Sequence, residues 1–236
     1  MQKSVIIVDD FYDDAMDVRA RALELEYPES DDAYYAGRNS REVLLTDGII
    51  QMVSHLIGSD LVPSPHSSIG NFRITLKDDK PKQDVHVDPN RDWAGVLYLT
   101  APEHCQGGTT FFRHKELGID KMPSDVEEIQ KFGYSDHEHM RRSIVEHDGM
   151  DRSKWEETMT IPMRFNRLVL FRSWFWHSFT ENFGDTMANG RLIQIFFFDF
   201  VARYQLQNQP QAANVMAAPK PSFKPTVAPY NFPLKT

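Results

Sequence analysis

The stretch Gln83-Asp84-Val85-His86-Val87-Asp88-Pro89-Asn90 carries a histidine and an aspartate two positions apart. On an extended strand, residues i and i+2 point to the same face. His86 and Asp88 would therefore present an imidazole and a carboxylate side by side, with Val87 turned into the opposite layer. This pair supplies two of the ligands of a 2-His-1-carboxylate site, which holds ferrous iron and leaves coordination positions open. The alternative is an ordinary strand pair that faces solvent, since His-x-Asp often arises by chance.

The missing ligand would be a histidine far along the chain, on an adjacent strand. His177, in Leu170-Phe171-Arg172-Ser173-Trp174-Phe175-Trp176-His177-Ser178-Phe179, is the best candidate. Its alternative role is that of a histidine packed among aromatic residues at the edge of the core.

An arginine follows at a useful position. Arg191 lies fourteen residues after His177 and opens the apolar strand 192–198. Its planar, permanently charged fork suits the far carboxylate of a dicarboxylate such as 2-oxoglutarate. The 2-oxo acid end of that molecule could then chelate the iron. Alternatively, Arg191 pairs with Asp185 or Glu181 and clamps a loop.

The composition of the chain narrows the class of protein to which it can belong. The chain has 236 residues, of which 41% are hydrophobic and 16 are Phe, enough for a sizeable β core. The formal net charge of -8 disfavours nucleic acid as the main partner. The single cysteine, Cys105, excludes an intrachain disulfide and fits a reducing compartment. No signal peptide and no membrane span is evident, so we expect a soluble cytoplasmic protein, with a homodimer compatible with the sequence.

The pattern of elements predicts a mainly β fold with flanking helices. Helices are expected over about 13–26 and 46–57, and Tyr34 to Ser40 reads as a loop. Short strands joined by turns are typical of a double-stranded β-helix, also called a jelly roll and cupin-like. The expected strands are 5–8, 68–76, a strand around His86, 93–100, 107–112, 166–171, 175–179 and 191–200.

Two segments depart from this pattern. Residues 114 to about 160 carry charged helical sequence, with helices expected over 126–132 and 138–146. We interpret them as an insertion that forms a substrate lid; a static ornament or a subunit contact is the alternative. Residues 205–236 are rich in Pro, Ala and Asn and are expected to form an extended tail. Residues 1–204 are then one domain, with its core at about 68–200.

These residues resemble the Fe(II)/2-oxoglutarate-dependent oxygenase superfamily, specifically its prolyl-hydroxylase-like branch. The resemblance covers about Ser68 to Phe200 and rests on six features of the sequence. They are His86-Val87-Asp88, Trp93-Ala94-Gly95-Val96-Leu97-Tyr98-Leu99, Gly107-Gly108-Thr109-Thr110-Phe111, Asn166-Arg167-Leu168-Val169-Leu170-Phe171, His177 and Arg191. The interval from His177 to Arg191 is longer than the commonest family spacing, and the insertion is peculiar to this chain.

The resemblance implies a catalytic site. Residues matching His86, Asp88 and His177 bind iron, and the one matching Arg191 binds the far carboxylate of 2-oxoglutarate. Tyr98 matches a strand tyrosine that often hydrogen-bonds the same carboxylate, although a tyrosine on a central strand can be plain packing. The implied activity is hydroxylation of a C–H bond in an amino acid, a peptidyl side chain or another small metabolite. It uses O2 and yields succinate and CO2. A non-catalytic jelly-roll binding protein and a cupin-like metal enzyme without 2-oxoglutarate are the alternatives.

Other candidate ligands are weaker. His137, His139 and His147 resemble a metal cluster but lie in the charged insertion, where a solvated helix face is the simpler interpretation. Arg73 and Asn71, near the first core strand, could face the pocket and touch substrate or co-substrate.

Overall fold

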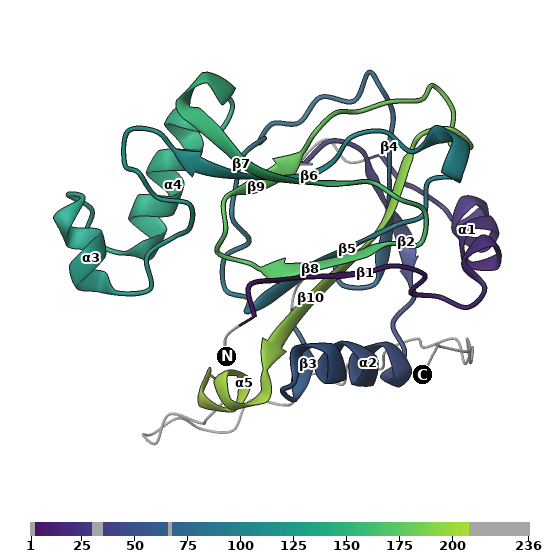
Figure 1. Cartoon of the computed structure of the whole chain (residues 1–236), viewed down its shortest axis with the longest axis horizontal. Helices are drawn as coiled ribbons and strands as arrows, with labels where there is room; N and C mark the ends of the chain where they lie inside the picture. The colour runs from purple at the N-terminus through teal and green to yellow at the C-terminus, as the bar shows by residue number, and fades with distance from the viewer. Residues whose placement is uncertain (1–2, 30–34, 66–67, 208–236) are drawn as a thin grey trace, which may run out of the picture.

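Two antiparallel sheets face each other across the middle of the molecule (Figure 1). The computed structural model describes residues 3–29, 35–65 and 68–207. The larger sheet has the order β1-β8-β5-β10-β4-β2, with β3 paired to β10, and the smaller has the order β7-β6-β9. Their bounds are β1 Val5–Val8, β2 Arg38–Val43, β3 Leu61–Pro63, β4 Asn71–Thr75, β5 Trp93–Tyr98, β6 Gly108–His114, β7 Trp155–Pro162, β8 Leu168–Arg172, β9 His177–Phe179 and β10 Arg191–Phe200.

Strand alternation gives the large sheet two apolar faces. On β5, Ala94 and Tyr98 point between the sheets and meet Phe111 from the small sheet. Trp93 and Leu97 point to the other side, into a second cluster beneath the helices. Because successive side chains on a strand alternate in direction, one sheet separates the two cores. The face between the sheets is the one that carries the candidate site.

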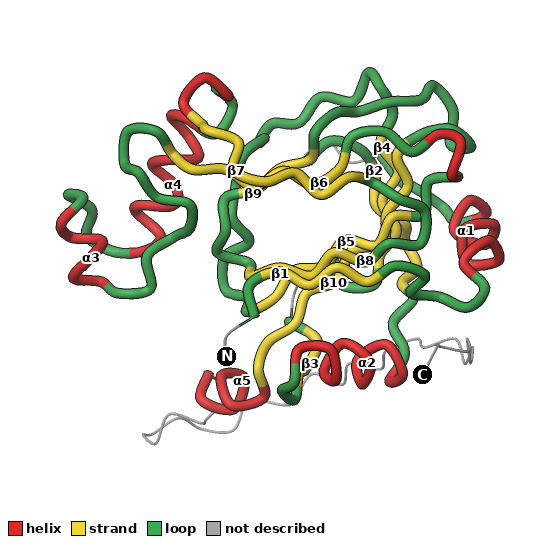
Figure 2. The backbone as a smooth tube through the Cα atoms, viewed as in Figure 1, coloured by secondary structure: helices red, strands yellow, loops and turns green. Residues whose placement is uncertain are grey.

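Two helices cover the outer face of the large sheet (Figure 2). They are α1 Ala15–Glu24 and α2 Asp47–Ile57. The hydroxyl of Thr46 accepts a hydrogen bond of 3.3 Å from the amide of Ile49 and so caps α2 at its N-terminus. Gly58 ends α2 in the left-handed region, with φ of 80°, which glycine adopts without a steric penalty.

The insertion packs into a third apolar cluster, which it shares with residues next to the candidate site. Its helices are α3 Val126–Lys131 and α4 His137–Asp148, which project to one side of the sheets (Figure 1). Met140 and Ile144 of α4 are buried together with Val85 and Val87, the two neighbours of His86. The remaining short elements are the 3₁₀ turns Pro102–His104 and Arg152–Lys154 and helix α5 Val201–Gln207.

The predicted fold class is confirmed: the chain is mainly β with flanking helices, and its sheets form a jelly roll. Helices α1 to α4 and strands β1 and β10 lie where the sequence indicated. The strand predicted around His86 is wrong, because His86 makes only an isolated bridge with His177. The residues on both sides of His86 do not belong to a strand.

Three further strands and a helix were not predicted. Strands β2 and β7 lie in a predicted loop and in the predicted insertion, and β3 follows α2. Both β2 and β7 are largely solvent-facing and polar, so they lack the apolar alternation that identifies a strand. Helix α5 begins at Val201 and includes the first residues, 205–207, of the predicted tail, and 208–236 lie outside the described residues. Among the described helices, none is both long and apolar enough to cross a membrane. The cytoplasmic location stays a prediction.

Candidate metal centre

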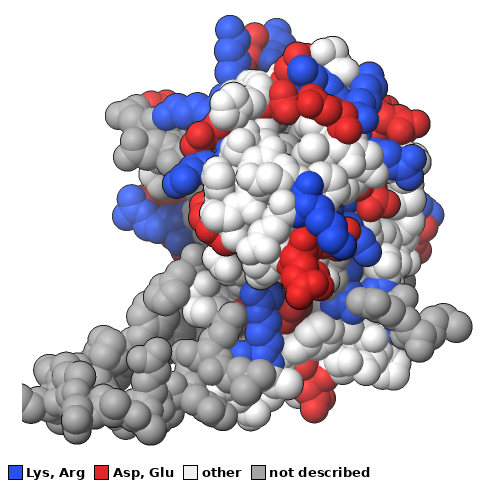
Figure 3. All heavy atoms as spheres, turned by 90° about the vertical axis from the view of Figure 1, so that its left-hand side faces the viewer, with Lys and Arg blue, Asp and Glu red and all other residues white. Residues whose placement is uncertain are grey.

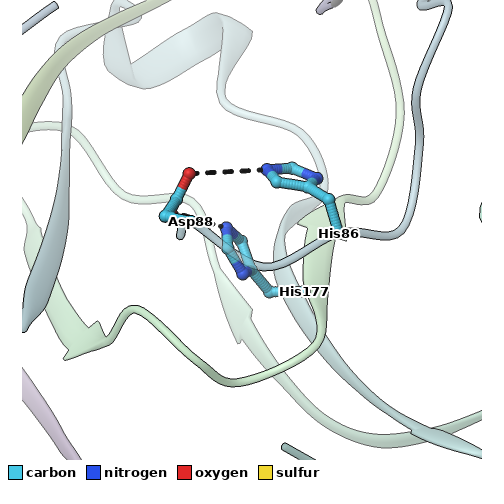
Figure 4. Close-up of side chains that lie close together, drawn as sticks. All are labelled: His86, Asp88 and His177. Carbon is cyan, nitrogen blue, oxygen red and sulfur yellow. Dashed lines mark ion pairs between the residues drawn. The ribbon is translucent and has the colours of Figure 1, made fainter. Parts of the chain in front are cut away.

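Three of the predicted residues converge on one point at the end of the space between the sheets. Figure 4 shows the side chains of His86, Asp88 and His177 directed toward one another. One ligand atom from each lies within 4.8 Å of the others. The Nε2 atoms of His86 and His177 are 3.9 and 3.4 Å from the Asp88 carboxylate oxygens. Within the described part of the chain, no other group of His, Cys, Asp or Glu side chains meets this geometry.

Backbone carbonyls fix the tautomer of both histidines. The Nδ1 atom of His86 lies 2.7 Å from the carbonyl of Asp84, and Nδ1 of His177 lies 2.9 Å from the carbonyl of Phe175. A carbonyl only accepts, so each Nδ1 carries the proton and donates it. Each Nε2 is then left with a lone pair aimed at the centre of the site. This arrangement is typical of metal-ligating histidines.

Burial keeps His86 neutral. Removal from water, followed by repulsion from His177, lowers the pKa of His86 to about 4, although Asp88 opposes the shift. A metal ion requires a deprotonated imidazole nitrogen as its ligand. The site therefore holds His86 in its ligating form at neutral pH without a competing proton.

The backbone around the three residues is tightly paired. His86 and His177 exchange amide-to-carbonyl hydrogen bonds of 3.0 and 2.9 Å, and the amide of Asp88 donates to the carbonyl of Ser173 over 2.8 Å. Val85 and Val87 alternate with the ligands and are buried in the insertion's cluster. The insertion thus packs directly behind the segment that carries two of the candidate ligands.

A partly buried ion pair joins the insertion to this segment, and sequence reasoning missed it. The guanidinium of Arg152 donates to both carboxylate oxygens of Asp84, over 2.6 and 2.9 Å. The hydroxyl of Ser178, next to His177, donates to the same carboxylate. The carbonyl of Asp84 orients His86, and its carboxylate binds Ser178, the neighbour of His177. The Asp84–Arg152 ion pair, called the brace below, therefore helps to position two of the candidate ligands. Asp84 and Arg152 are 68 positions apart, and no local signal links them.

Arg191 lies on the inward face of β10. It is 6% exposed, and its guanidinium carbon lies 5.6 Å from the centre of the Phe179 ring. Among the described residues, no carboxylate is within ion-pair distance of Arg191. Asp185 instead accepts from the side chain of Asn189, so the structure does not support the loop clamp. Burial lowers the pKa of Arg191 to about 10.

Tyr98 shares the space that Arg191 faces. Its side chain is fully buried and its hydroxyl shares a hydrogen bond of 2.6 Å with the hydroxyl of Thr109 on β6. Burial raises the pKa of Tyr98, while the charge of Arg191 opposes the rise. The phenol is thus a neutral hydrogen-bonding group beside a buried cation.

A cavity of about 1190 Å³ opens beside Asp88. Its walls include Arg91, Lys121 and Arg141, together with Trp174 of the turn before β9. The histidines of the insertion do not contribute a metal cluster. His137, His139 and His147 lie on exposed positions of α4, as the solvated helix face predicted, although His137 lines the outer cavity wall.

Comparisons with known proteins identify a family and distant folds. The model of a family described as "Family of unknown function (DUF6445)" matches residues 1–198. No curated protein matches the chain significantly. A structure of HygX from Streptomyces hygroscopicus, with nickel and 2-oxoglutarate bound, is similar at 11% identity and a TM-score of 0.48, covering 85% of this chain and 84% of its own. The non-heme alpha-ketoglutarate-dependent epimerase SnoN, from nogalamycin biosynthesis, is similar at 14% identity and a TM-score of 0.48, covering 99% and 94%. Likeness at these TM-scores is too distant to assign an activity.

Proposed function

The chain belongs to DUF6445, a family of unknown function, and for this member we propose an Fe(II)- and 2-oxoglutarate-dependent oxygenase that hydroxylates a C–H bond. The proposal includes the prolyl-hydroxylase-like branch, which the resemblance of the sequence favours. His86, Asp88 and His177 hold the iron, and Arg191, together with Tyr98, anchors 2-oxoglutarate. The substrate is an amino acid, a peptidyl side chain or another small metabolite.

One observation carries this proposal: a convergent 2-His-1-carboxylate set lies in the same interior as a buried arginine that has no counter-charge among the described residues. The donor set fits ferrous iron, because two imidazole nitrogens and one carboxylate leave positions open for other ligands. A buried charge is costly unless it is paired. The missing partner of Arg191 is therefore expected to be an anionic ligand, and the far carboxylate of 2-oxoglutarate supplies that charge.

The residues of the chain position the reactants and keep the site dry. Arg191 aligns one end of the 2-oxo diacid, and Tyr98 offers a neutral hydrogen bond from the neighbouring strand. Ile193, Ile195 and Phe171 line the space between the sheets and exclude water. When bound, ferrous iron supplies the activation of dioxygen, coupled to the decarboxylation of 2-oxoglutarate to succinate and carbon dioxide.

The surface near the insertion supports a small or peptidyl substrate over nucleic acid. In Figure 3, which shows that side of the molecule, basic and acidic side chains are interspersed. A backbone of phosphates is bound through a continuous basic surface. The cavity walls contain acidic Asp120, Glu128 and Glu138 as well as basic residues.

Anaerobic titration of the protein with Fe(II) and 2-oxoglutarate tests the proposal. We expect a visible charge-transfer absorption band that requires both components. His177→Ala should abolish the band, whereas His139→Ala on the exposed face of α4 should keep it. A metal-binding jelly roll or a cupin-like enzyme that does not use 2-oxoglutarate would bind Fe(II) without producing the band. Mass spectrometry of candidate substrates for the gain of one oxygen atom would then identify the product.

A further inference from the structure

A second arginine faces the site, and the proposed co-substrate does not account for it. Arg73 lies on β4 directly opposite Ile193 of β10, which in turn lies opposite Tyr98 of β5. Residues paired across antiparallel strands project from the same face of the sheet. Arg73 therefore shares the inward face with Tyr98 and with Arg191, which is two positions from Ile193 on the same strand.

Neutral groups hold Arg73 in place. Its Nε donates to the amide oxygen of Asn39 over 2.7 Å, and Asn39 is its direct partner on β2. Its guanidinium carbon lies 5.3 Å from the centre of the Tyr35 ring. The same ring lies 4.6 Å from the imidazole of His86, centre to centre. Arg73 is thus fixed one aromatic ring away from a predicted metal ligand.

No carboxylate forms an ion pair with Arg73 in the described part of the chain. Burial lowers the pKa of Arg73, and the nearby Tyr35 phenol and Asp88 carboxylate oppose that shift. Asp88 attracts Arg73 in the metal-free protein. A ferrous ion would more than cancel the charge of Asp88, so this carboxylate cannot serve both groups.

Counted over the metal ligands and the two arginines of the inward face alone, the loaded site has one positive charge left over. A ferrous ion carries two charges, of which Asp88 cancels one, and both histidines are neutral ligands. Arg191 and Arg73 add one charge each, so the protein and metal together present three. The doubly charged 2-oxoglutarate neutralises two of them. Arg73 is half-buried, and a charge withdrawn from water is costly unless it is paired, so an anionic ligand would stabilise it.

We propose that Arg73, held by Asn39 and Tyr35, binds a carboxylate of the primary substrate beside the metal. The inference rests on the proposed function, because the charge balance includes the iron and the co-substrate. An arginine fork matches a carboxylate with two parallel hydrogen bonds. A phosphate monoester carries roughly 1.5 to 2 negative charges at neutral pH and would exceed the balance. The substrate class is accordingly a carboxylic acid with one net negative charge near the reacting carbon.

Matched probes test this assignment. The protein is loaded anaerobically with Fe(II) and 2-oxoglutarate, and its melting temperature is measured with N-acetyl amino acids and with the corresponding N-acetyl amino acid amides. Each pair differs only in carboxylate against carboxamide. We expect the acids to raise the melting temperature more than the amides. The difference should vanish in Arg73→Gln and shrink in Arg73→Lys, which keeps the charge but loses the fork.

Arg113→Gln is the matched control. Arg113 is a solvent-exposed arginine of β6 whose guanidinium lies 3.8 Å from Glu156, away from the metal ligands. This variant should keep the acid-over-amide difference. Equal effects of acids and amides on the parent protein would overturn the proposal. So would a difference that survives in Arg73→Gln.

A third measurement separates the two ligands. The dissociation constant of 2-oxoglutarate, from the absorption titration, should be nearly unchanged in Arg73→Gln. A rise of tenfold or more would assign Arg73 to the co-substrate and overturn its role with the substrate. Failure of the parent protein to bind 2-oxoglutarate at all would instead refute the proposed function, so the two failures are distinguishable.

Discussion

Replacing Arg191 with methionine should separate ligand binding from stability. The side chain is buried, and no carboxylate pairs with it among the described residues. If it grips a carboxylate of 2-oxoglutarate, the loss of a buried charge-assisted pair costs about 2–4 kcal/mol of binding free energy. Since about 1.4 kcal/mol corresponds to a tenfold change, the dissociation constant should rise roughly 30- to 700-fold.

The same change should not destabilise the ligand-free protein. Burial lowers the pKa of Arg191 to about 10. One pKa unit corresponds to about 1.4 kcal/mol, so carrying this charge in the folded state costs on the order of 3 kcal/mol at neutral pH. A lowered pKa of a basic group means that the unfolded chain holds the proton more tightly, so stability is reduced at every pH below the folded value. Methionine removes that cost and fills similar volume.

Two assays check the pair of expectations. Anaerobic titration gives the dissociation constant of 2-oxoglutarate, and urea denaturation of the ligand-free protein gives the free energy of unfolding. Arg167→Met is the matched control, because Arg167 pairs with Asp9 outside the site, over 2.6 Å. It should leave 2-oxoglutarate binding unchanged. An Arg191→Met protein that binds 2-oxoglutarate like the parent, or that loses stability, would refute the reasoning and make Arg191 a structural residue.

Three further outcomes are expected. Asp84→Asn weakens the ion pair with Arg152 and should lower Fe(II) affinity roughly 10–100-fold, the usual effect of replacing residues that orient metal ligands. The surface variant Asp151→Asn should leave Fe(II) affinity unchanged. Equal Fe(II) affinities of Asp84→Asn and the parent protein in calorimetry would exclude this role of the ion pair. His139→Ala should retain the affinity of the parent for Fe(II), and loss of iron by metal analysis would show that the insertion contributes a ligand. In hydrogen exchange without ligands, the amides of α4 should exchange slowly because Met140 and Ile144 are buried. Protection that depends on ligands would then be confined to the cavity wall at 118–124. Rapid exchange of the α4 amides would instead make the whole insertion a mobile lid.

Local chemistry was enough to predict the parts of the site that depend on short-range pattern. Two-residue periodicity places His86 and Asp88 on one side of an extended segment and Val87 on the other, whether or not a neighbouring strand completes the ladder. Apolar runs identified β1, β5, β8 and β10, because buried strands must be apolar on at least one face. The polar edge strands β2 and β7 carry no such pattern, so the sequence indicated a loop and a charged insertion there.

Only the tertiary structure decided which charges are paired. Asp84 and Arg152 are far apart in the chain, and either could have been a solvated surface residue. Whether Arg191 met Asp185 or faced the interior depended on how the loop before β10 folds, which propensity does not encode. The position of Arg73 opposite Ile193 follows from strand register. Register and burial are set by the packing of whole sheets. They decide that Arg152 pairs with Asp84, whereas Arg73 and Arg191 have no carboxylate partner among the described residues.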